Sequence, residues 1–276
     1  MWCGAGAGRR GCVVERSYVV TGGGRGVGRA VVERLAGDGA HVVAVEMDGA
    51  ALEWMGGHPA RERLAGVVGD AGDEAVAERA ADRAGERGPL AGWVNNAAVF
   101  RDASVHSSSA REVLELIGLN LAPAVAGCAV AVRRFLEQGG TGAVVNVSSH
   151  QAQRAVPGCV PYVTAKAGIE GLTRALAVEY GARGVRVNAV ALGSIATERY
   201  AAFLAGRSAA EAASVEEEMG RLHPVGRVGT VREVAGAVAF LLSEEAGFIN
   251  GATVPVDGGR GVLARDPESH DAPGAG

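Results

Sequence analysis

Tyr162 and Lys166 are the residues of this sequence whose types and spacing point most directly to chemistry. Lys166 is the only lysine, and every other member of the 27 basic residues is an arginine. On a helix, side chains four positions apart lie on one face as neighbours. An ammonium beside a phenol favours the phenolate, so we expect the pKa of Tyr162 to fall from about 10 toward neutrality. Such a phenol exchanges protons near neutral pH, as general acid–base catalysis requires.

The choice of lysine at this position supports that interpretation. Arginine is a poor substitute, because its planar fork is harder to fit beside a phenol than a compact ammonium. In a chain that uses arginine everywhere else, a retained lysine at position 166 is therefore informative. The alternative is an ordinary solvated lysine one helical turn from a tyrosine. We predict a functional Tyr162–Lys166 pair.

The stretch TGGGRGVG follows an apolar strand and opens a helix. Glycines in such a turn allow a tight bend, close approach of the backbone to a pyrophosphate and close packing of helix on strand. The N-terminus of the helix offers unpaired amides and a positive dipole end to the phosphates. The order of strand, turn and helix predicts a dinucleotide site. The residues assigned to it are Gly22, Gly24, Arg25, Gly26, Val27 and Gly28.

Glu46 is the first charged residue after the apolar run of the second strand. A carboxylate at this place accepts hydrogen bonds from the adenosine ribose hydroxyls and repels a 2′-phosphate. Arg25 acts in the opposite sense, since a guanidinium in the turn could pair with that phosphate. The repulsion between a buried carboxylate and a 2′-phosphate costs more free energy than one exposed arginine gains by pairing with that phosphate. We therefore expect Glu46 to decide the cofactor preference. The cofactor prediction is NAD rather than NADP.

Strand and helix patterns alternate about seven times along the chain. This alternation predicts an α/β fold, a single Rossmann-like doubly wound parallel sheet with helices on both faces and ligands at the carboxyl ends of its strands. We expect a dinucleotide-binding and catalytic domain over 17–260, a flexible N-terminal extension over 1–16 and a flexible tail over 261–276. The expected strands are 18–21, 41–48, 64–70, 91–98, 142–149, 185–192 and 252–257, and the expected helices are 26–39, 73–87, 110–137, 162–180 and 231–243.

Composition bounds the class of protein. With 48% apolar residues, 21% charged residues and a mean hydropathy of +0.14, the chain has enough apolar mass for a sizeable core. A net charge of −4 argues against nucleic acid as a partner. We see no apolar run approaching the roughly 20 residues of a membrane span, and no apolar signal core at the N-terminus. The cysteines, at positions 3, 12, 128 and 159, show neither metal-ligand spacing nor a disulfide framework, which predicts no metal site and a reducing cytoplasm.

The ordered motifs resemble those of the short-chain dehydrogenase/reductase family over about 18–259. TGGGRGVG resembles the family's T-G-x-x-x-G-x-G, YVTAK its Y-x-x-x-K, and Ser149 stands where the family has a catalytic serine. Asn120 in GLNLAP matches its catalytic asparagine. Two positions depart from the family pattern: Ala98 replaces the glycine of N-N-A-G, and Leu192 replaces the proline of V-N-x-V-x-P-G-x-x-x-T. Both departures affect packing or loop geometry near the cofactor, and neither affects the proton-transfer groups.

The resemblance implies hydride transfer between a nicotinamide and a secondary alcohol or ketone. Tyr162 would exchange the hydroxyl proton, Ser149 would hold the substrate oxygen, and Lys166 would bind the nicotinamide ribose and keep the pKa of Tyr162 low. Asn120 would hold a water that relays protons from Lys166, although a helix-bending hydrogen bond is the alternative. Further implied cofactor residues, besides the glycine turn, Tyr162 and Lys166, are Glu46, Met47, Asp70, Ala71, Asn96, Ala97, Ala98, Gly193, Ile195 and Thr197.

The expected substrate pocket is lined by residues flanking the serine and tyrosine and by a helical lid. We call residues 194–224 the lid segment, and we expect it to be mobile. His150 could relay protons, but an orienting or wall-forming imidazole is the interpretation that we favour. The pocket residues are Phe100, His150, Gln151, Val156, Cys159 and Leu192.

Three functions are compatible with these residues. The favoured hypothesis is an NAD-dependent secondary-alcohol dehydrogenase that serves specialised metabolism. An NADPH-dependent β-ketoacyl or polyketide ketoreductase is the first alternative, and a non-catalytic dinucleotide-binding regulator is the second. The helix over 110–137 is apolar on every side between 122 and 132, which indicates either core burial or the subunit-packing helix of the family. We expect a homotetramer or homodimer.

Overall fold

A parallel sheet of seven strands forms the centre of the computed structural model, which describes residues 16–101 and 103–264. The strand order is β3-β2-β1-β4-β5-β6-β9, so the direction of winding reverses between β1 and β4. In such sheets ligands bind at this switch point, beyond the carboxyl ends of the strands. The strands are β1 (Ser17–Thr21), β2 (His41–Glu46), β3 (Leu64–Val68), β4 (Leu90–Asn95), β5 (Gly142–Ser149), β6 (Val185–Leu192) and β9 (Thr253–Val256).

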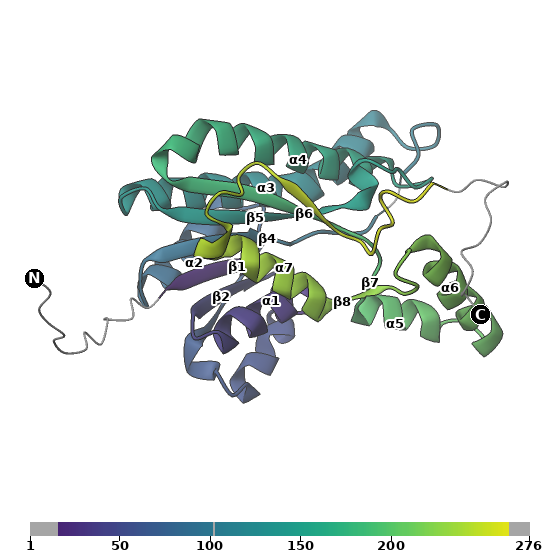
Figure 1. Ribbon diagram of the computed structural model, residues 1–276, viewed down its shortest axis with the longest axis horizontal. Coiled ribbons are helices and arrows are strands. Elements are labelled where there is room, and N and C mark those ends of the chain that lie inside the picture. The colour runs from purple at the N-terminus through teal and green to yellow at the C-terminus, as the bar shows by residue number, and fades with distance from the viewer. Residues whose placement is uncertain (1–15, 102, 265–276) are drawn as a thin grey trace, which may run out of the picture.

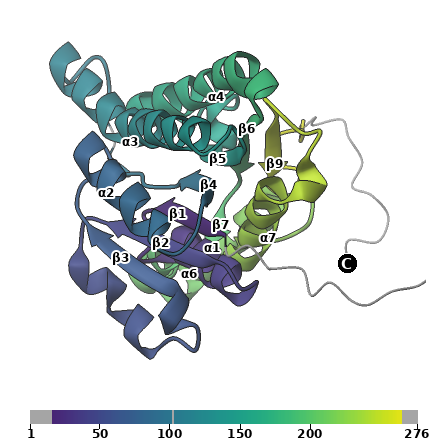
Figure 2. The same cartoon turned by 90° about the vertical axis from the view of Figure 1, so that its left-hand side faces the viewer.

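Helices cover both faces of the sheet. In Figures 1 and 2, α1 and α7 lie against one face and α2, α3 and α4 against the other. The predicted fold class is therefore confirmed, down to the number of strands. The helices are α1 (Gly26–Gly37), α2 (Glu74–Gly85), α3 (Ala110–Glu137), α4 (Val160–Tyr180), α5 (Glu198–Ala205), α6 (Ala209–Leu222) and α7 (Val231–Leu242).

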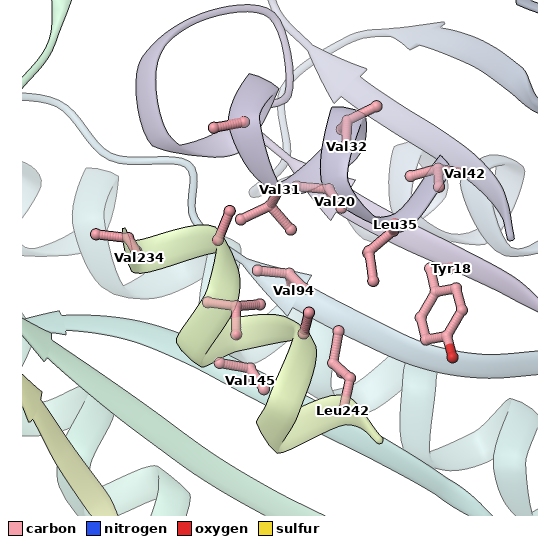
Figure 3. Close-up of a cluster of buried hydrophobic side chains, with 14 of the residues drawn as sticks. Tyr18, Val20, Val31, Val32, Leu35, Val42, Val94, Val145, Val234 and Leu242 are labelled. Atoms are coloured by element: carbon pink, nitrogen blue, oxygen red, sulfur yellow. The ribbon is translucent and has the colours of Figure 1, made fainter. Parts of the chain in front are cut away.

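The core consists of two apolar layers, one on each side of the sheet. Figure 3 shows the layer beneath α1 and α7, where Val20 and Val145 of the strands lie among Val31 of α1 and Val234 of α7. A second cluster fills the space between the sheet and α2, α3 and α4. Strands buried on both faces read as continuous apolar runs, which is why the strands were recognisable in the sequence.

Strand β4 is shorter than the expected 91–98. It ends at Asn95 because the next two amides leave the ladder: the backbone N–H groups of Asn96 and Ala97 both donate to Thr21 Oγ1, at 3.0 and 3.1 Å. A 3₁₀ helix over Gly49–Gly57 has no counterpart among the expected elements. Its glycine-flanked sequence lacks the 3.6-residue apolar period on which a helix prediction depends.

Helix α3 has the bounds expected from the sequence. Ser109 caps it by accepting a hydrogen bond from the Glu112 N–H at 3.2 Å. Alone among the helices of the described residues, α3 is long and apolar enough to cross a membrane by composition, so the statement that no such run exists was wrong. Part of its apolar surface packs on β4 and β5 and on the neighbouring helices α2 and α4, and 44% of its most apolar window is buried.

The lid segment is mostly helical. Its helices α5 and α6 lie beyond one end of the sheet, on the right of Figure 1. A capping box of Ser208 and Glu211 starts α6. Two short parallel strands, β7 (Ile195–Ala196) and β8 (Gly229–Thr230), pair with one another and join the two ends of this helical excursion. The predicted N-terminal extension and C-terminal tail lie almost wholly outside the described residues, as do Cys3 and Cys12.

Candidate active site

Tyr162, Ser149 and Lys166 converge at the carboxyl end of β5. Ser149 is the last residue of β5, and Tyr162 stands in the first turn of α4, where the two side chains are hydrogen-bonded to each other. Lys166 follows one turn later with its Nζ atom 5.5 Å from the centroid of the Tyr162 ring. All three are buried. The spacing argument therefore places the lysine and the tyrosine together, and the strand end supplies the serine.

Burial reverses the expected direction of the Tyr162 pKa. Desolvation raises the pKa of Tyr162 to about 12, against smaller opposing effects of the Ser149 hydrogen bond and the positive charge of Arg199. Burial also lowers the pKa of Lys166 to about 8. A low-dielectric site penalises the charged form of both groups. The expectation that Lys166 brings the phenol toward neutrality was wrong, because burial acts more strongly on the pKa of Tyr162.

Lys166 is held by the strand on which Ser149 lies. Its Nζ donates to the backbone oxygen of Val147 at 2.7 Å, and the residue is only 2% exposed. The ordinary solvated lysine is thereby excluded. An ammonium buried with a single hydrogen-bond acceptor among the described residues keeps donors available for a further acceptor at the site.

Lys166→Arg is expected to lower kcat by about 100-fold. A guanidinium is too wide for a fully enclosed ammonium site, and overpacking forces side chains out of position, so a small misplacement of Tyr162 follows. Steady-state kinetics with a thermal unfolding scan measure this effect, and Arg174→Lys on the exposed face of the same helix is the control. Wild-type kinetics in Lys166→Arg would contradict a specific role for the ammonium.

Asn120 connects α3 to the segment that follows β4. Its Oδ1 accepts from the Val99 N–H at 3.0 Å, and its Nδ2 donates to the Leu116 carbonyl one turn earlier at 3.3 Å. The contact with Leu116 is the helix-side hydrogen bond that the sequence left as an alternative. Asn120 therefore fixes the loop carrying Phe100, and the proton relay through a water stays a prediction.

The glycine turn has the shape that a pyrophosphate requires. Gly22 and Gly26 adopt positive φ angles of 64° and 52°. A Cβ on Gly28 would come within 2.0 Å of the Gly22 carbonyl oxygen, so only glycine allows this approach of helix to strand. Helix α1 begins without a side-chain cap and without an acidic residue in its first turn, which leaves its amides and positive dipole end for an anion. These features fit a dinucleotide.

The carboxylate of Glu46 lies directly against this turn. It accepts hydrogen bonds from the Gly24 N–H at 3.1 Å and from the Met47 N–H at 3.0 Å. The guanidinium of Arg25 turns away from Glu46 and pairs with Asp48, with 2.5 Å between Nη2 and Oδ2. Asp48 thus competes for the one cation of the turn that could hold a 2′-phosphate.

Asn96 and Ala97 are fixed beside the glycine turn by Thr21. The Asn96 Nδ2 donates to the carbonyls of Thr21 and Gly22, both at 3.1 Å. Asn95 has a different position: its amide is buried and donates to Asn146 Oδ1 at 2.8 Å, away from the turn. The two adjacent asparagines of the motif therefore differ, Asn95 joining β4 to β5 and Asn96 closing the turn.

The remaining predicted cofactor residues are spread along the same edge of the sheet. Asp70 is exposed, and its Oδ1 accepts from the Gly72 N–H at 2.8 Å. Thr197 caps α5 by accepting from the Tyr200 N–H at 3.3 Å, and a Cβ on Gly26 would lie 3.4 Å from its methyl group. The start of the lid segment therefore contacts the phosphate-binding turn. Ala71, Ala98, Gly193 and Ile195 follow strand ends or lie in β7.

Phe100 contacts Tyr162, and His150 directly follows Ser149. The Phe100 ring stacks on the Tyr162 ring with 5.1 Å between centroids and 30° between planes. His150 is buried, its Nδ1 hydrogen-bonds the Leu192 carbonyl at 3.0 Å, and burial lowers its pKa. Leu192 therefore reaches the site through its backbone. Val156 and Cys159 lie in the loop before α4, where the Cys159 N–H donates to the Val156 carbonyl.

Some buried polar atoms of the predicted pocket and of the lid segment have no hydrogen-bond partner among the described residues. Among the described residues they include His150 Nε2 and Gln151 Oε1, directly after the serine, and the Tyr200 hydroxyl in the lid segment. Buried polar groups in proteins are almost always hydrogen-bonded, so an unpartnered group indicates a place for water or a ligand. The pocket predicted around Ser149 and Tyr162 has such groups available.

Three residues of the site were not predicted. Thr21 was assigned only to the strand, although it is the first letter of the motif TGGGRGVG and its hydroxyl accepts two backbone amides. Asp48 has no sequence signal, because its role depends on its distance from Arg25. Arg199 lies over Phe100 and could not be found without knowing how the lid segment folds.

Comparison with known proteins gives a consistent result. A family model described as enoyl-(acyl carrier protein) reductase matches residues 22–260. Short-chain reductase protein NovJ from Streptomyces niveus is 38% identical over 254 residues, which cover 89% of this chain and 94% of that protein. Levodione reductase from Leifsonia aquatica is 35% identical over 253 residues, with the same coverage of 89% and 94%.

Solved structures agree with the sequence matches. The crystal structure of levodione reductase superposes with a TM-score of 0.80 at 33% identity and covers 90% of this chain and 98% of that one. An actinorhodin polyketide ketoreductase with NADPH superposes with a TM-score of 0.81 at 26% identity and the same coverage. The resemblance therefore extends over nearly the whole described chain.

Proposed function

Because the chain belongs to the short-chain dehydrogenase/reductase family, we propose that it is an NAD-preferring dehydrogenase of secondary alcohols, acting reversibly on the corresponding ketones. Membership makes the chain an oxidoreductase acting on CH–OH groups, so the non-catalytic regulator is set aside. The family binds a nicotinamide dinucleotide. Our proposal adds the cofactor preference, the role of each residue in the reaction and the oligomeric state.

The residues of the site have separate tasks in this reaction. When bound, the nicotinamide supplies hydride transfer to or from the carbinol carbon. Tyr162 exchanges the proton of the substrate oxygen, and Ser149, hydrogen-bonded to Tyr162, holds that oxygen. Lys166 adds positive charge beside the phenol and donates hydrogen bonds at the floor of the site. Thr21 and Asn96 keep the glycine turn in the shape that accepts the pyrophosphate.

The position of Glu46 carries the cofactor proposal. Its carboxylate is held by two backbone amides at the glycine turn, where a 2′-phosphate would face a negative charge. Arg25, the residue that could offset this repulsion, is paired with Asp48. Like charges a few ångströms apart repel by several kcal/mol even at an effective dielectric of about 20. The local charges therefore favour NAD.

Wild-type protein is expected to show a kcat/KM for NAD at least about 100-fold above that for NADP, and Glu46→Gln is expected to reduce this preference by about tenfold. Glutamine keeps the size and one acceptor oxygen but removes the charge. Adding Asp48→Asn, which releases Arg25, is expected to reduce the preference further. Steady-state kinetics with both cofactors measure this.

Glu53→Gln is the matched control for the charge change. Glu53 is an exposed carboxylate on the 3₁₀ helix that follows Asp48, and its removal should leave the preference unchanged. A wild-type preference for NADP would contradict the proposal and would support the second candidate, an NADPH-dependent ketoreductase. The NADPH in the actinorhodin ketoreductase structure is the observation that keeps this candidate in view.

We include a homotetramer or homodimer and a cytoplasmic location in the same proposal. Helices α3 and α4 lie side by side in both views of the fold. Leu114 and Val125 of α3 and Val178 of α4 are exposed, although they are apolar. Exposed apolar residues gathered on neighbouring helices favour association with another copy.

A further inference from the structure

A three-layer stack joins the lid segment to the catalytic tyrosine. The Phe100 ring lies on the Tyr162 ring, and the guanidinium carbon of Arg199 lies 3.9 Å from the Phe100 ring centroid. The stack thus combines a residue of α4, a residue of the loop after β4 and a residue of α5. Arg199 brings a positive charge over the ring that stacks on Tyr162.

The location of Arg199 within α5 is unfavourable for the helix itself. It stands in the first turn, where the positive end of the helix dipole disfavours a cation. Among the described residues it forms no ion pair, whereas Arg25 and Arg227, at either side of the lid segment, each have a carboxylate partner. An exposed cation at an unfavourable position without a protein counter-ion is available to an external anion.

Two carboxylates of this region, those of Glu198 and Asp257, have neighbours other than Arg199. Glu198, the neighbour of Arg199, extends toward the glycine turn, where its Oε2 lies 3.5 Å from the position of a Cβ on Gly26. Asp257, which acts on His150 together with Arg260, has its oxygens occupied by the amides of Gly259 and Gly261. Neither carboxylate is therefore an ion-pair partner of Arg199.

The charge of Arg199 already reaches the reacting group. It is the cation that lowers the pKa of Tyr162, against the larger effect of burial. A guanidinium near enough to act on the phenol through space is near enough to contact a substituent of a substrate whose oxygen is bound there. The planar guanidinium of Arg199 can donate two parallel hydrogen bonds to one carboxylate.

We propose that Arg199 is a specificity-determining residue that binds an anionic group, a carboxylate in the first instance, on the alcohol or ketone substrate. The inference rests on the proposed dehydrogenase function and names its substrate class. The reacting carbon lies at Ser149 and Tyr162, and the anionic group lies beside Phe100 under the first turn of α5. The substrate is then a hydroxy or oxo acid and not a neutral alcohol.

The test compares ketones that differ only in charge. The pairs are levulinate with levulinamide, and 4-oxocyclohexanecarboxylate with its carboxamide, each reduced with NADH. Wild-type protein should show a kcat/KM at least about tenfold higher for the carboxylates, as expected for one charged hydrogen bond. Arg199→Gln should remove this preference by raising KM for the carboxylates, with KM for the amides changed by less than about twofold. Arg199→Lys should restore part of it, since it keeps the charge without the fork.

Arg207→Gln is the matched control. Arg207 also belongs to the lid segment and also stacks on a phenylalanine, with its guanidinium carbon 3.4 Å from the Phe203 ring centroid, but it is not part of the stack on Tyr162. Its removal should leave the preference for carboxylates intact. Equal loss of both members of a pair in Arg199→Gln would mean a structural role, and equal use of both by the wild type would mean no anion site. Either result overturns the inference.

A binding measurement separates this inference from the proposed function. Calorimetry of the protein with NAD, titrated with cyclohexanecarboxylate or its carboxamide, should show selective binding of the carboxylate that Arg199→Gln weakens by about tenfold. Selective binding without turnover of any ketone or alcohol would support the anion site and contradict the dehydrogenase. Turnover of ketones without charge selectivity would contradict only the anion site.

Discussion

Tyr162→Phe is expected to lower kcat by at least about 1,000-fold while leaving the dissociation constant for NAD nearly unchanged. Positioned acid–base groups contribute about 100-fold to 10,000-fold to rate, and the hydroxyl of Tyr162 is the group hydrogen-bonded to Ser149 at the end of β5. Phenylalanine keeps the ring on which Phe100 stacks, so the site should retain its shape. Steady-state kinetics and calorimetric binding of NAD measure the two quantities.

The control for this change is Tyr180→Phe, at the other end of the same helix. It should leave kcat within about twofold of wild type, as is usual for a substitution far from the chemistry. Comparison of wild type with Tyr162→Phe also isolates the titration of Tyr162. The phenolate absorbance that the variant lacks should rise with a pKa of about 12, because burial raises the pKa of Tyr162 to that value. Substantial turnover in Tyr162→Phe would refute the proton-transfer role.

Gly28→Ala is expected to remove measurable binding of NAD and to destabilise the fold. The added Cβ would stand 2.0 Å from the Gly22 carbonyl oxygen and 2.6 Å from Asn96 Nδ2, and the first of these is backbone that a rotamer change cannot move. Overpacking usually costs about 1–3 kcal/mol, and a clash with backbone belongs at the upper end or above. Relief of the clash requires opening the turn, which displaces the amides that face the pyrophosphate.

Gly37→Ala provides the comparison within the same helix. Gly37 is the last residue of α1, and a Cβ there meets nothing within 4 Å. This change should leave NAD binding intact and stabilise the protein slightly, because alanine restricts the unfolded chain more than glycine does. Thermal unfolding and calorimetry report on both variants. Wild-type affinity for NAD in Gly28→Ala would show that the turn is not the phosphate site.

The sheet was predictable because its signals are local. Each central strand is a run of apolar residues closed by glycine or a polar residue, and the apolar residues of α3 continue on both sides of Pro123, which lies inside the helix. The carboxyl ends of parallel strands share one edge, and the resemblance to the family identified Ser149 as the serine that meets Tyr162 there. Neither step needed a distance.

The electrostatics of the site were less predictable because they depend on burial. The spacing of Tyr162 and Lys166 correctly placed the two groups together, but the direction of the Tyr162 pKa is set by how much water the site excludes. Phe100 covers the phenol, and Asn120 anchors its loop through Val99. Both residues lie far from Tyr162 in the sequence.

The same limit applies to the charges around the glycine turn. The sequence left Glu46 and Arg25 as opposing influences on the cofactor. The partner of Arg25 is Asp48, which is two residues from Glu46 and had no motif to mark it. Pairing between a turn and the end of the neighbouring strand follows from the parallel register of β1 and β2 and becomes visible only in three dimensions.

The small ladder of β7 and β8 has a consequence for how this enzyme could diversify. The register of Ile195 with Gly229 and of Ala196 with Thr230 brings the two ends of a long excursion together independently of what lies between them. Because the entropy of closing a loop grows only slowly with its length, the intervening residues can lengthen, shorten or be exchanged at little expense to the sheet. New substrate preferences can thus be acquired by exchanging the part of this excursion beyond α5, with Thr197 and the strand ends that carry Ser149 and the glycine turn retained.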